Sequence, residues 1–385
     1  MKKCIWVFMC LGALSELHAQ VISEKEAVDQ ALKNYPSVQI ANMRTQIQKE
    51  LERTAFNPQQ TQLTFEVPTD FGLAFEFHQQ FDFPGVYSTR SKWLKSQTRN
   101  SAEAANITRH ELTRDVRLSY LDVQVLEAFV RILSRQDSLW RDIEISTQRL
   151  FDGGQINRAD VLYASKQAGL INNRLANTRI DAINALAGLS LYTGQNLTEV
   201  EALSVLPLTL LDTMGSFYFD QYLSESKQVA ERKLAVSKAE RMPGLIVGYL
   251  RTPDRDTEFR YRFNAGVTIP LWQGQYQGEV DAGKIALETR QAETALQRQQ
   301  AQTRRRQLLQ TLGQTSSALN WFERTAIPQT DDLVLTYRRL YEGGEVDYAL
   351  ALRNIADAVD MQTEYLETLK RYNQSVIELE FLSGQ

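Results

Sequence analysis

The sequence predicts a mainly α-helical chain with a small β portion, built from two internal repeats. The observations behind this prediction are long stretches with helical spacing, short stretches in which polar and apolar residues alternate, and landmarks that occur twice. The landmarks recur in the same order with a shift of 185 to 190 residues. They are Pro58 and Pro243, Pro84 and Pro270, and the turns RLFDGGQINRADVL from Arg149 and RLYEGGEVDYALAL from Arg339. Three ordered landmarks indicate an internal duplication.

The first repeat is expected over residues 20–195. Its elements, in order, are a helix over 23–56, strands over 61–67 and 72–83, a helix over 88–150, a tip turn over 151–156 and a helix to about 192. The first helix is expected to break at Tyr35-Pro36, because proline has no backbone N–H to donate. The stretch 88–150 contains neither proline nor glycine. As one helix it would be about 95 Å long and would need neighbouring helices along its whole length.

The second repeat is expected over residues 216–385, after an irregular connector over 196–215. Its elements, in order, are a helix, strands over 244–251 and 258–269, a helix over 275–341, a tip turn over 341–346 and a helix to about 381.

In the long helix of the first repeat, mostly apolar residues recur at alternating spacings of four and three. They are Leu112, Val116, Ser119, Val123, Leu126, Val130 and Leu133. This spacing predicts a coiled-coil seam, so the helices are expected to pack as antiparallel coiled coils.

Residues 1–19 resemble a signal peptide for export. Lys2 and Lys3 precede an apolar run over 5–14, and a cleavage is expected before Gln20. The run is too short to span a bilayer. No later stretch is apolar and long enough for a transmembrane helix.

The cysteines and histidines predict neither a disulfide nor a metal site in the exported chain. Cys4 and Cys10 both lie in the expected signal peptide, so we expect no disulfide, thiol or cysteine ligand in the mature protein. Lipid attachment at Cys10 is not expected, because Met9 stands where a small residue is required. His78 and His110 remain, and no spacing resembles a site for a first-row metal.

The formal net charge of −4 argues against nucleic-acid binding. We find no catalytic or nucleotide-binding motif, and we expect neither an enzyme nor a cofactor.

The strands show the sharpest pattern in the sequence. In GLAFEFHQQFDF and EFRYRFNAGVTI, aromatic and apolar residues alternate with polar ones. One face would hold Leu73, Phe75, Phe77, Phe81 and Phe83 from the first stretch, with Phe259, Tyr261, Phe263, Val267 and Ile269 from the second. The other face would hold Glu76, His78, Gln80 and Asp82, with Glu258, Arg260, Arg262, Asn264 and Thr268. The strand over 244–251 is less clear, because it is apolar on both faces.

Two interpretations of this alternation compete. In a soluble protein, the apolar face would cover a core and the polar face would meet water. In a membrane barrel, the aromatic face meets lipid and the polar face lines an aqueous lumen. Four strands cannot close a barrel, and open edges in lipid would leave backbone groups without hydrogen bonds. If the strands span a bilayer, several chains must therefore share one barrel.

Over the whole mature chain, the sequence resembles the TolC-type outer membrane factors, the exit ducts of bacterial efflux and type I secretion systems. The resemblance rests on ISEKEAVDQALKNYPSVQIA at 22–41, the proline-ended strands and the doubled glycine turns. It implies a homotrimer in the bacterial outer membrane, with a shared 12-stranded transmembrane β-barrel and a helical barrel in the periplasm. EGGEVDYALAL is most similar to the heavy-metal efflux branch. This points to an inner-membrane pump of the resistance–nodulation–division type, with heavy-metal cations as cargo, and to a periplasmic adaptor protein as partner.

The resemblance also assigns roles to individual residues. The adaptor-contacting tip turns would comprise Phe151, Gly153, Gly154, Tyr341, Gly343 and Gly344. Asp160 and Tyr341 would form a gate at the tunnel entrance. The barrel lumen would be lined by Glu76, His78, Gln80, Asp82, Arg260 and Arg262, and the lipid face by Phe75, Phe77, Phe81, Phe259, Tyr261 and Phe263. Leu350 departs from the family, since many members have an acidic residue there.

A second interpretation remains open at this point. The chain could be a soluble periplasmic coiled-coil scaffold or adaptor whose strands form a small water-facing sheet. The duplication counts against an adaptor, which needs one helical hairpin with flanking β domains. Extraction from membranes only by detergent would favour the duct, and release by osmotic shock would favour the scaffold.

Overall fold

The computed structural model describes residues 21–67, 73–207, 216–252, 260–272, 274–343 and 348–384, and places no side chains at 341–343 and 348. The expected signal peptide over 1–19 and the predicted lipid-face residue Phe259 lie outside the described residues. The chain divides into two compact units. Unit 1 comprises Met1–Asn34, Val116–Val205 and Ser317–Asn373, and unit 2 comprises Tyr35–Asp115, Leu206–Ser316 and Gln374–Gln385.

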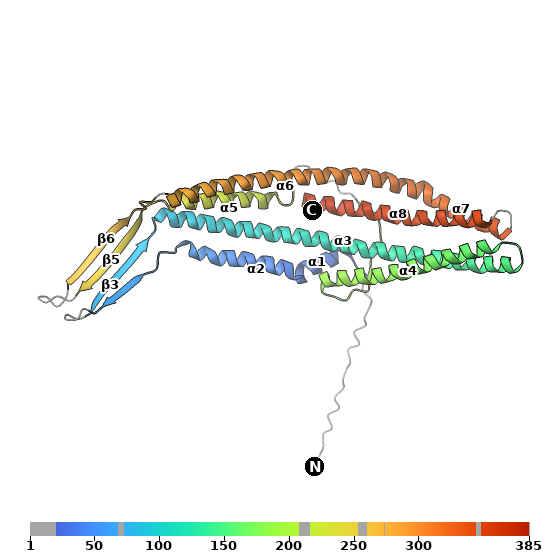
Figure 1. The fold of residues 1–385 in the computed structure, drawn as a ribbon, viewed down its shortest axis with the longest axis horizontal. Helices are drawn as coiled ribbons and strands as arrows, with labels where there is room; N and C mark the ends of the chain where they lie inside the picture. Colours follow the sequence, from blue (N-terminus) through green and yellow to red (C-terminus); the bar gives the residue numbers. More distant parts are fainter. Residues whose placement is uncertain are drawn as a thin grey trace, which may run out of the picture. The chain divides into compact units, whose positions relative to one another are not determined.

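Helices make up most of the described chain, as the sequence predicts (Figure 1). The helices are α1 (Glu24–Asn34), α2 (Pro36–Leu51), α3 (Pro84–Asp152), α4 (Arg158–Thr193), α5 (Asp220–Ala239), α6 (Gly274–Trp321), α7 (Ile327–Gly343) and α8 (Tyr348–Ser383). A 3₁₀ turn, η1, covers Glu52–Ala55, and a π-helical turn, η2, covers Phe322–Ala326. The strands are β1 (Val21–Ile22), β2 (Gln62–Glu66), β3 (Ala74–Phe81), β4 (Glu199–Val200), β5 (Gly244–Thr252) and β6 (Arg260–Thr268). The order α2, β2, β3, α3, α4 thus recurs as α5, β5, β6, α6–α7, α8, although the duplication itself stays a prediction.

Prolines set several of the helix boundaries. The first helix breaks where Pro36 begins α2, and Tyr35 before it is extended, with φ −73° and ψ 129°. Helix α3 begins at Pro84, four residues before the start expected at residue 88. Proline fits the first turn of a helix, because the N–H that it lacks would have no partner there.

One predicted helix is divided. The stretch 275–341 was expected to be a single helix, but the π-helical turn Phe322–Ala326 separates α6 from α7. Pro328 is the second residue after this turn. A proline inside a helix removes one hydrogen bond and crowds the carbonyl four residues before it, and a single wider turn relieves that conflict. The sequence pattern did not account for Pro328.

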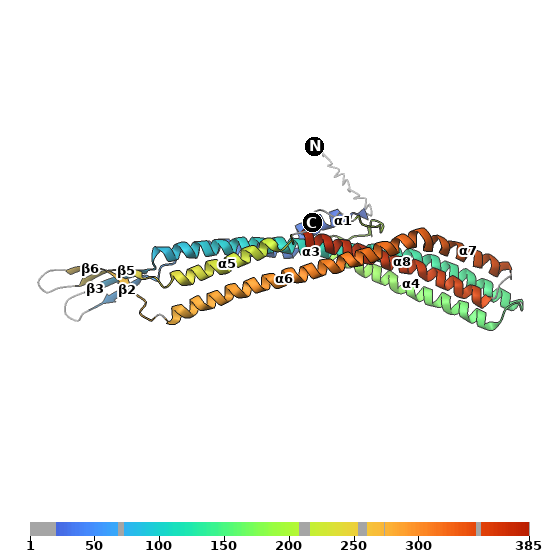
Figure 2. The same ribbon diagram turned by 90° about the horizontal axis from the view of Figure 1, so that it is seen from above.

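Unit 1 is held together by a core between helical hairpins. Its buried side chains come from α3, α4 and α8, and they are Trp140, Ile143, Ala164, Ala168, Ile171, Ala351, Leu352, Ile355 and Val359. Small alanines on α4 and α8 let these helices approach the large ring of Trp140, which is 1% exposed. Figure 2 shows α7 and α8 running alongside each other in this unit, and the same pair is adjacent in Figure 1.

Unit 2 consists of a four-stranded sheet and a layer of helices. The strand order is β2-β3-β5-β6, and every neighbouring pair is antiparallel. The helices of the layer follow the order α2, α3, α5, α6 in Figure 1, so that α2 and α6 form its outer edges. In the sheet, β2 and β6 are the edge strands. The strands therefore leave one open edge at β2 and one at β6 among the described residues.

Candidate functional site

The register of the sheet places the aromatic residues of three strands on one face. Phe77 of β3 lies opposite Tyr249 of β5, which lies opposite Phe263 of β6. In the next row, Phe75 is opposite Arg251, which is opposite Tyr261. Ring centroids are 5.0 Å apart for Tyr249 and Phe263, and 6.3 Å apart for Phe75 and Tyr249. Phe81, the remaining described residue of the predicted lipid face, lies opposite Leu245 on the same face.

This aromatic face is exposed in the single chain. Phe263 is 80% exposed, and Phe65 and Tyr261 are each 61% exposed. Their rings contact Phe75 and Tyr249 of the neighbouring strands, with 5.2 Å between the centroids of Phe65 and Phe75. The face therefore does not cover a core within the described part of the chain.

The register also assigns the two faces of β5, the strand over 244–251 that the sequence left unclear. Leu245, Val247 and Tyr249 of β5 share the aromatic face, whereas Ile246, Gly248 and Leu250 share the polar one. Sequence analysis missed Tyr249, because its strand is apolar on both sides.

Sequence analysis also missed Gln79, which lies on the aromatic face but is only 7% exposed. The Gln79 amide donates to the carbonyl oxygen of Gln59 at 2.7 Å and accepts from the Thr61 hydroxyl at 2.5 Å.

The polar face brings the predicted lumen residues together. Glu76, His78 and Gln80 of β3 share it with Arg260 and Arg262 of β6. Their rows are His78–Gly248–Asn264 and Glu76–Leu250–Arg262. The His78 Nε2 and Asn264 Nδ2 atoms are 3.4 Å apart, and His78 Nδ1 is 3.4 Å from a Glu76 carboxylate oxygen. A Cβ atom on Gly248 would lie 2.0 Å from Asn264 Oδ1, so glycine makes room for this polar row.

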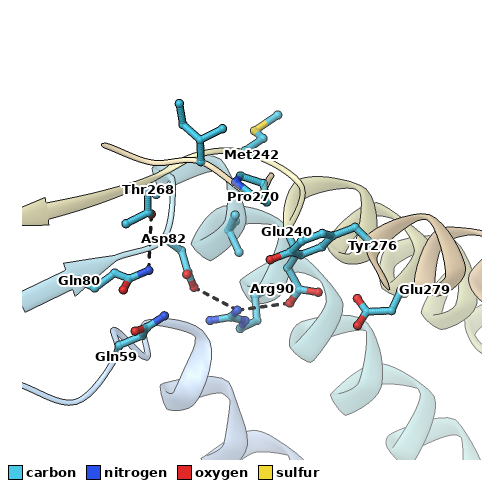
Figure 3. A pocket seen from close by; sticks show the side chains of 13 residues that line it. Gln59, Gln80, Asp82, Arg90, Glu240, Met242, Thr268, Pro270, Tyr276 and Glu279 are labelled. Carbon is cyan, nitrogen blue, oxygen red and sulfur yellow. Dashed lines mark hydrogen bonds and ion pairs between the residues drawn. The ribbon is translucent and has the colours of Figure 1, made fainter. Parts of the chain in front are cut away.

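Asp82 follows the last residue of β3 and lies at the foot of the sheet, where the strands join the helices. Its carboxylate accepts a hydrogen bond from Arg90 at 3.3 Å, and the same Arg90 nitrogen is 3.4 Å from Glu240 (Figure 3). The backbone N–H of Asp82 donates to the Tyr87 hydroxyl at 2.8 Å. These contacts link β3, α3 and the end of α5. A cavity of about 440 Å³ lies beside them, with Gln59, Tyr276 and Glu279 also on its wall.

The first tip turn is a Schellman motif that ends α3. The N–H of Gln155 donates to the carbonyl oxygen of Leu150 at 2.9 Å, and the N–H of Gly154 donates to that of Phe151 at 2.9 Å. Gly154 has φ +71°, a conformation that glycine adopts without steric cost. Asn157 then begins α4, and its side chain accepts from the N–H groups of Ala159 and Asp160. Sequence analysis missed this cap, although NRAD directly after a glycine turn is typical of a helix start.

The other tip residues are only partly described. Phe151 is 36% exposed beside the turn, whereas Asp160 is 7% exposed in the first turn of α4. A carboxylate there is favoured by the positive end of the helix dipole. Gly343 is the last residue of α7. Gly344 and the side chain of Tyr341 lie outside the described residues, so the contact between Asp160 and Tyr341 stays a prediction.

Tyr120 joins three segments of unit 1, and sequence analysis did not single it out. Its hydroxyl donates to the carbonyl oxygen of Ile22 at 2.8 Å and accepts from the N–H of Glu201 at 3.0 Å. The side chain thus fastens α3 to the paired strands β1 and β4, which run parallel with Ile22 opposite Val200. Burial raises the pKa of the Tyr120 hydroxyl to about 12, against the lowering effect of the Glu201 N–H.

The described residues contain neither a cluster of metal ligands nor a helix that could span a membrane. Among them, no three His, Cys, Asp or Glu side chains are grouped so that they could hold a metal ion. No helix in the described ranges is both apolar and long enough to cross a bilayer.

Comparison with known proteins identifies solved structures that share the fold of this chain. No family model and no curated protein matches the sequence. Solved structures do match: CusC, described for its transmembrane channel formation, has 16% sequence identity and a TM-score of 0.79, with 93% of this chain and 91% of that chain covered. The outer membrane channel CmeC of Campylobacter jejuni has 14% identity and a TM-score of 0.78, covering 94% and 85%. The outer membrane protein VceC of Vibrio cholerae has 14% identity and a TM-score of 0.75, covering 93% and 94%. The chain has the fold of these proteins, which confirms the mainly helical fold that the TolC-type resemblance implied. The shared 12-stranded barrel stays a prediction.

Proposed function

On the premise of this shared fold, we propose that the chain is the outer-membrane exit duct of a tripartite efflux system. Three copies form the duct in the bacterial outer membrane, with most of each chain in the periplasm. The duct passively conducts substrates that an inner-membrane pump expels and that a periplasmic adaptor passes on. The absence of an enzymatic motif agrees with this passive role.

The exposed aromatic face of the sheet is the observation that carries the proposal. Burying a side chain such as phenylalanine is worth about 1.5–3 kcal/mol, so a soluble protein would rarely leave a whole row of them in water. Phe65 on β2 and Tyr261 and Phe263 on β6 lie on this face, and each residue is more than half exposed. Hydrocarbon would cover this face and leave the polar face, with His78 and Arg262, to water. The soluble scaffold loses support, because its sheet would need a core on the aromatic side.

Sharing a barrel between copies solves the problem of the open edges. The four strands alternate in direction, so β2 and β6 run in opposite directions. When β6 of one copy lies beside β2 of the next, the pair is again antiparallel. With four strands from each chain, three copies close a barrel of twelve strands with every backbone group paired.

The outer helices of unit 2 also need a partner. Helix α2 exposes an apolar stripe at spacings of three and four: Ile40, Met43, Ile47 and Leu51, which are 41–57% exposed. At the other edge, α6 exposes Ile285 and Leu296, which lie on one face of the helix because they are close to three turns apart. Contact between α2 of one copy and α6 of the next would bury the α2 stripe and these two side chains, in the same rotational order that joins β6 to β2.

The tip turns are the proposed docking site for the adaptor. Around Gly154, the apolar side chains of Phe151, Ile145 and Leu162 are 36–60% exposed on α3 and α4. An adaptor that presents helical hairpins could pack on these side chains. The pump of resistance–nodulation–division type and the heavy-metal cargo rest on the resemblance of EGGEVDYALAL, whose residues 344–347 lie outside the described residues.

A pair of neighbouring substitutions on β2 tests the proposal. Phe65→Arg places a charge on the proposed lipid face, where an arginine near the bilayer midplane costs about 2–4 kcal/mol. Thr64→Arg, one residue earlier, places the same charge on the lumen face and serves as the matched control. We expect Phe65→Arg to be lost from the outer-membrane fraction and to give no conductance in planar bilayers. Thr64→Arg should insert, conduct and change the ion selectivity.

The soluble scaffold predicts the opposite result. In that case the wild-type protein leaves the cell on osmotic shock, and both arginines, at the exposed position 65 and the half-buried position 64, are tolerated equally. Equal insertion and conductance of the two variants would contradict the assignment of the faces.

A further inference from the structure

The aromatic face of the sheet carries one charged side chain among the described residues of its paired strands. The register aligns Phe65 of β2, Phe75 of β3, Arg251 of β5 and Tyr261 of β6 in a single row across the sheet, here called the distal row. The other paired positions on this face are apolar or aromatic, apart from the buried Gln79. Arg251 is therefore the exception on the face for which we propose contact with lipid.

The distal row lies at the end of the sheet that is remote from the helices of unit 2. Arg251 is the last residue but one of β5, and Tyr261 is the second residue of β6. The strands meet the helices at their other end, where Asp82 pairs with Arg90 (Figure 3). In the proposed duct the helices lie in the periplasm. The distal row then lies towards the outer surface of the membrane.

Aromatic rings surround Arg251. Phe75 and Tyr261 are its direct neighbours on β3 and β6, and side chains directly opposite one another have Cβ atoms about 4.5–5.5 Å apart. Tyr249, two positions earlier in β5, has its ring centroid 6.3 Å from that of Phe75 and 6.2 Å from that of Tyr261. Arg251 is half-buried, whereas Tyr261 is 61% exposed. The Arg251 side chain thus emerges between rings on the outer surface of the proposed barrel.

The spacing along the chain places Arg251 at the outer limit of the apolar band. From Tyr261, apolar residues recur at every second position through Val267 to Ile269 and Leu271. Tyr261 and Leu271 are ten positions apart. At about 3.4 Å per extended residue and a tilt of roughly 40°, this separation gives a height of about 26 Å, close to the roughly 25 Å of the apolar band in outer-membrane barrels. Arg251, beside Tyr261, therefore lies where hydrocarbon gives way to headgroups.

We propose that Arg251 binds a phosphate group of an outer-leaflet glycolipid, while the rings of the distal row contact its acyl chains. This inference rests on the proposed function. The guanidinium group presents its N–H donors in a planar fork that matches the oxygen atoms of a phosphate. An arginine on the lipid face of a barrel is also far less costly near the interface than at the bilayer midplane. Three copies would provide three such sites around the barrel.

A lipid suits this position better than a neighbouring copy or a dissolved anion does. Strand β5 is an inner strand of the sheet, between β3 and β6, so the edges that join neighbouring copies are not beside Arg251. An anion in the aqueous lumen would meet Arg262 on the polar face first. Arg251 instead shares its row with three aromatic residues, which favour a ligand that carries both a phosphate and hydrocarbon.

Native mass spectrometry of the delipidated trimer in detergent tests the proposal. The probe is lipid A with both phosphates, and lipid A from which the phosphates have been removed is its matched control. We expect the wild type to prefer the phosphorylated lipid, and Arg251→Gln to bind it about tenfold more weakly, because a hydrogen bond to a charged group is lost. Arg262→Gln removes a charge from the polar face, next to Tyr261 in the sequence, and should bind lipid A as the wild type does.

Several results would overturn the inference. Equal binding of the two lipids by the wild type would refute a phosphate site, and this comparison holds even if Arg251→Gln fails to assemble. Equal binding of lipid A by the wild type and Arg251→Gln would show that Arg251 serves contacts within the protein. Competition by inorganic phosphate at the concentration of lipid A would reveal a site for free anions and refute the lipid assignment.

Conductance of the wild type in planar bilayers distinguishes failure of this inference from failure of the proposed function. A conducting duct that shows no preference for phosphorylated lipid refutes the Arg251 site alone. A wild-type chain that neither inserts nor conducts refutes the proposed duct, and the lipid site with it.

Discussion

Tyr120 shows how one side chain organises segments that are far apart in the chain. Its hydroxyl lies between the carbonyl oxygen of Ile22, 98 positions away, and the N–H of Glu201, 81 positions away. The ring is 1% exposed, so no water replaces a lost bond. Gln124 adds hydrogen bonds to the carbonyl oxygens of Glu201 and Ala202 on the same connector.

Removing the hydroxyl should therefore destabilise unit 1. We expect Tyr120→Phe to lower the free energy of unfolding by about 1–3 kcal/mol, because the carbonyl group of buried Ile22 and the N–H group of Glu201 lose their partner. Denaturant unfolding in detergent measures the change. Tyr372→Phe is the control, since the described residues form no hydrogen bond with that hydroxyl. An equal effect of both substitutions would show that the Tyr120 hydroxyl is not the cause.

The Tyr120 hydroxyl also makes the free energy of unfolding depend on pH. Burial raises the pKa of Tyr120 to about 12, above its value of roughly 10 in an unfolded chain. The neutral hydroxyl is favoured in the folded state, so its stabilisation is complete below pH 10 and declines as the pH rises towards 12. The difference in stability between wild type and Tyr120→Phe should shrink over this interval. If the difference in stability between wild type and Tyr120→Phe stayed constant from pH 8 to 12, the Tyr120 hydroxyl would not be the source of the pH dependence.

At the level of elements, the tip turn depends on one backbone conformation. Gly154 has φ +71°, whereas its neighbour Gly153 does not have a positive φ. An added Cβ meets nothing within 4 Å at Gly154 and only ordinary contacts at 3.6 Å at Gly153. Any cost at Gly154 therefore comes from the backbone and not from packing.

The two glycines form a matched pair of tests. We expect Gly154→Ala to cost about 1–2 kcal/mol, because L-residues are strained in the left-handed region. Gly153→Ala should be close to neutral, and Gly154→Asn should recover part of the loss, since asparagine tolerates this conformation. Unfolding of unit 1, followed by circular dichroism, ranks the three variants. Equal losses at 153 and 154 would argue against the Schellman turn.

The elements also show what the sequence could and could not predict. The alternation of Phe75, Phe77 and Phe81 sufficed to assign two faces, because a strand has a period of two. Tyr249 was hidden, since its face became clear only from pairing with Phe77 and Phe263. The divided helix at Phe322–Ala326 depends on Pro328, which a periodicity search passes over. The Tyr120 contacts were beyond prediction, because they join residues that only the folded chain brings together.

For the whole molecule, the proposed duct explains the open sheet and the exposed helix side chains together. The described residues leave two strand edges unpaired, and they expose aromatic side chains of the sheet and an apolar stripe on α2. In the proposed duct, cyclic association of identical copies would pair the edges and bury the stripe, and lipid would cover the aromatic face. The low sequence identity of 14–16% to CusC, CmeC and VceC fits this account, because alternation and helical spacing need only residue classes and not particular residues.

Native mass spectrometry of the mature protein, extracted from bacterial outer membranes in detergent, tests the central claim most directly. The account predicts a particle with the mass of three chains that dissociates when the detergent is replaced by denaturant. A stable single chain, obtained from the soluble fraction without detergent, would contradict it.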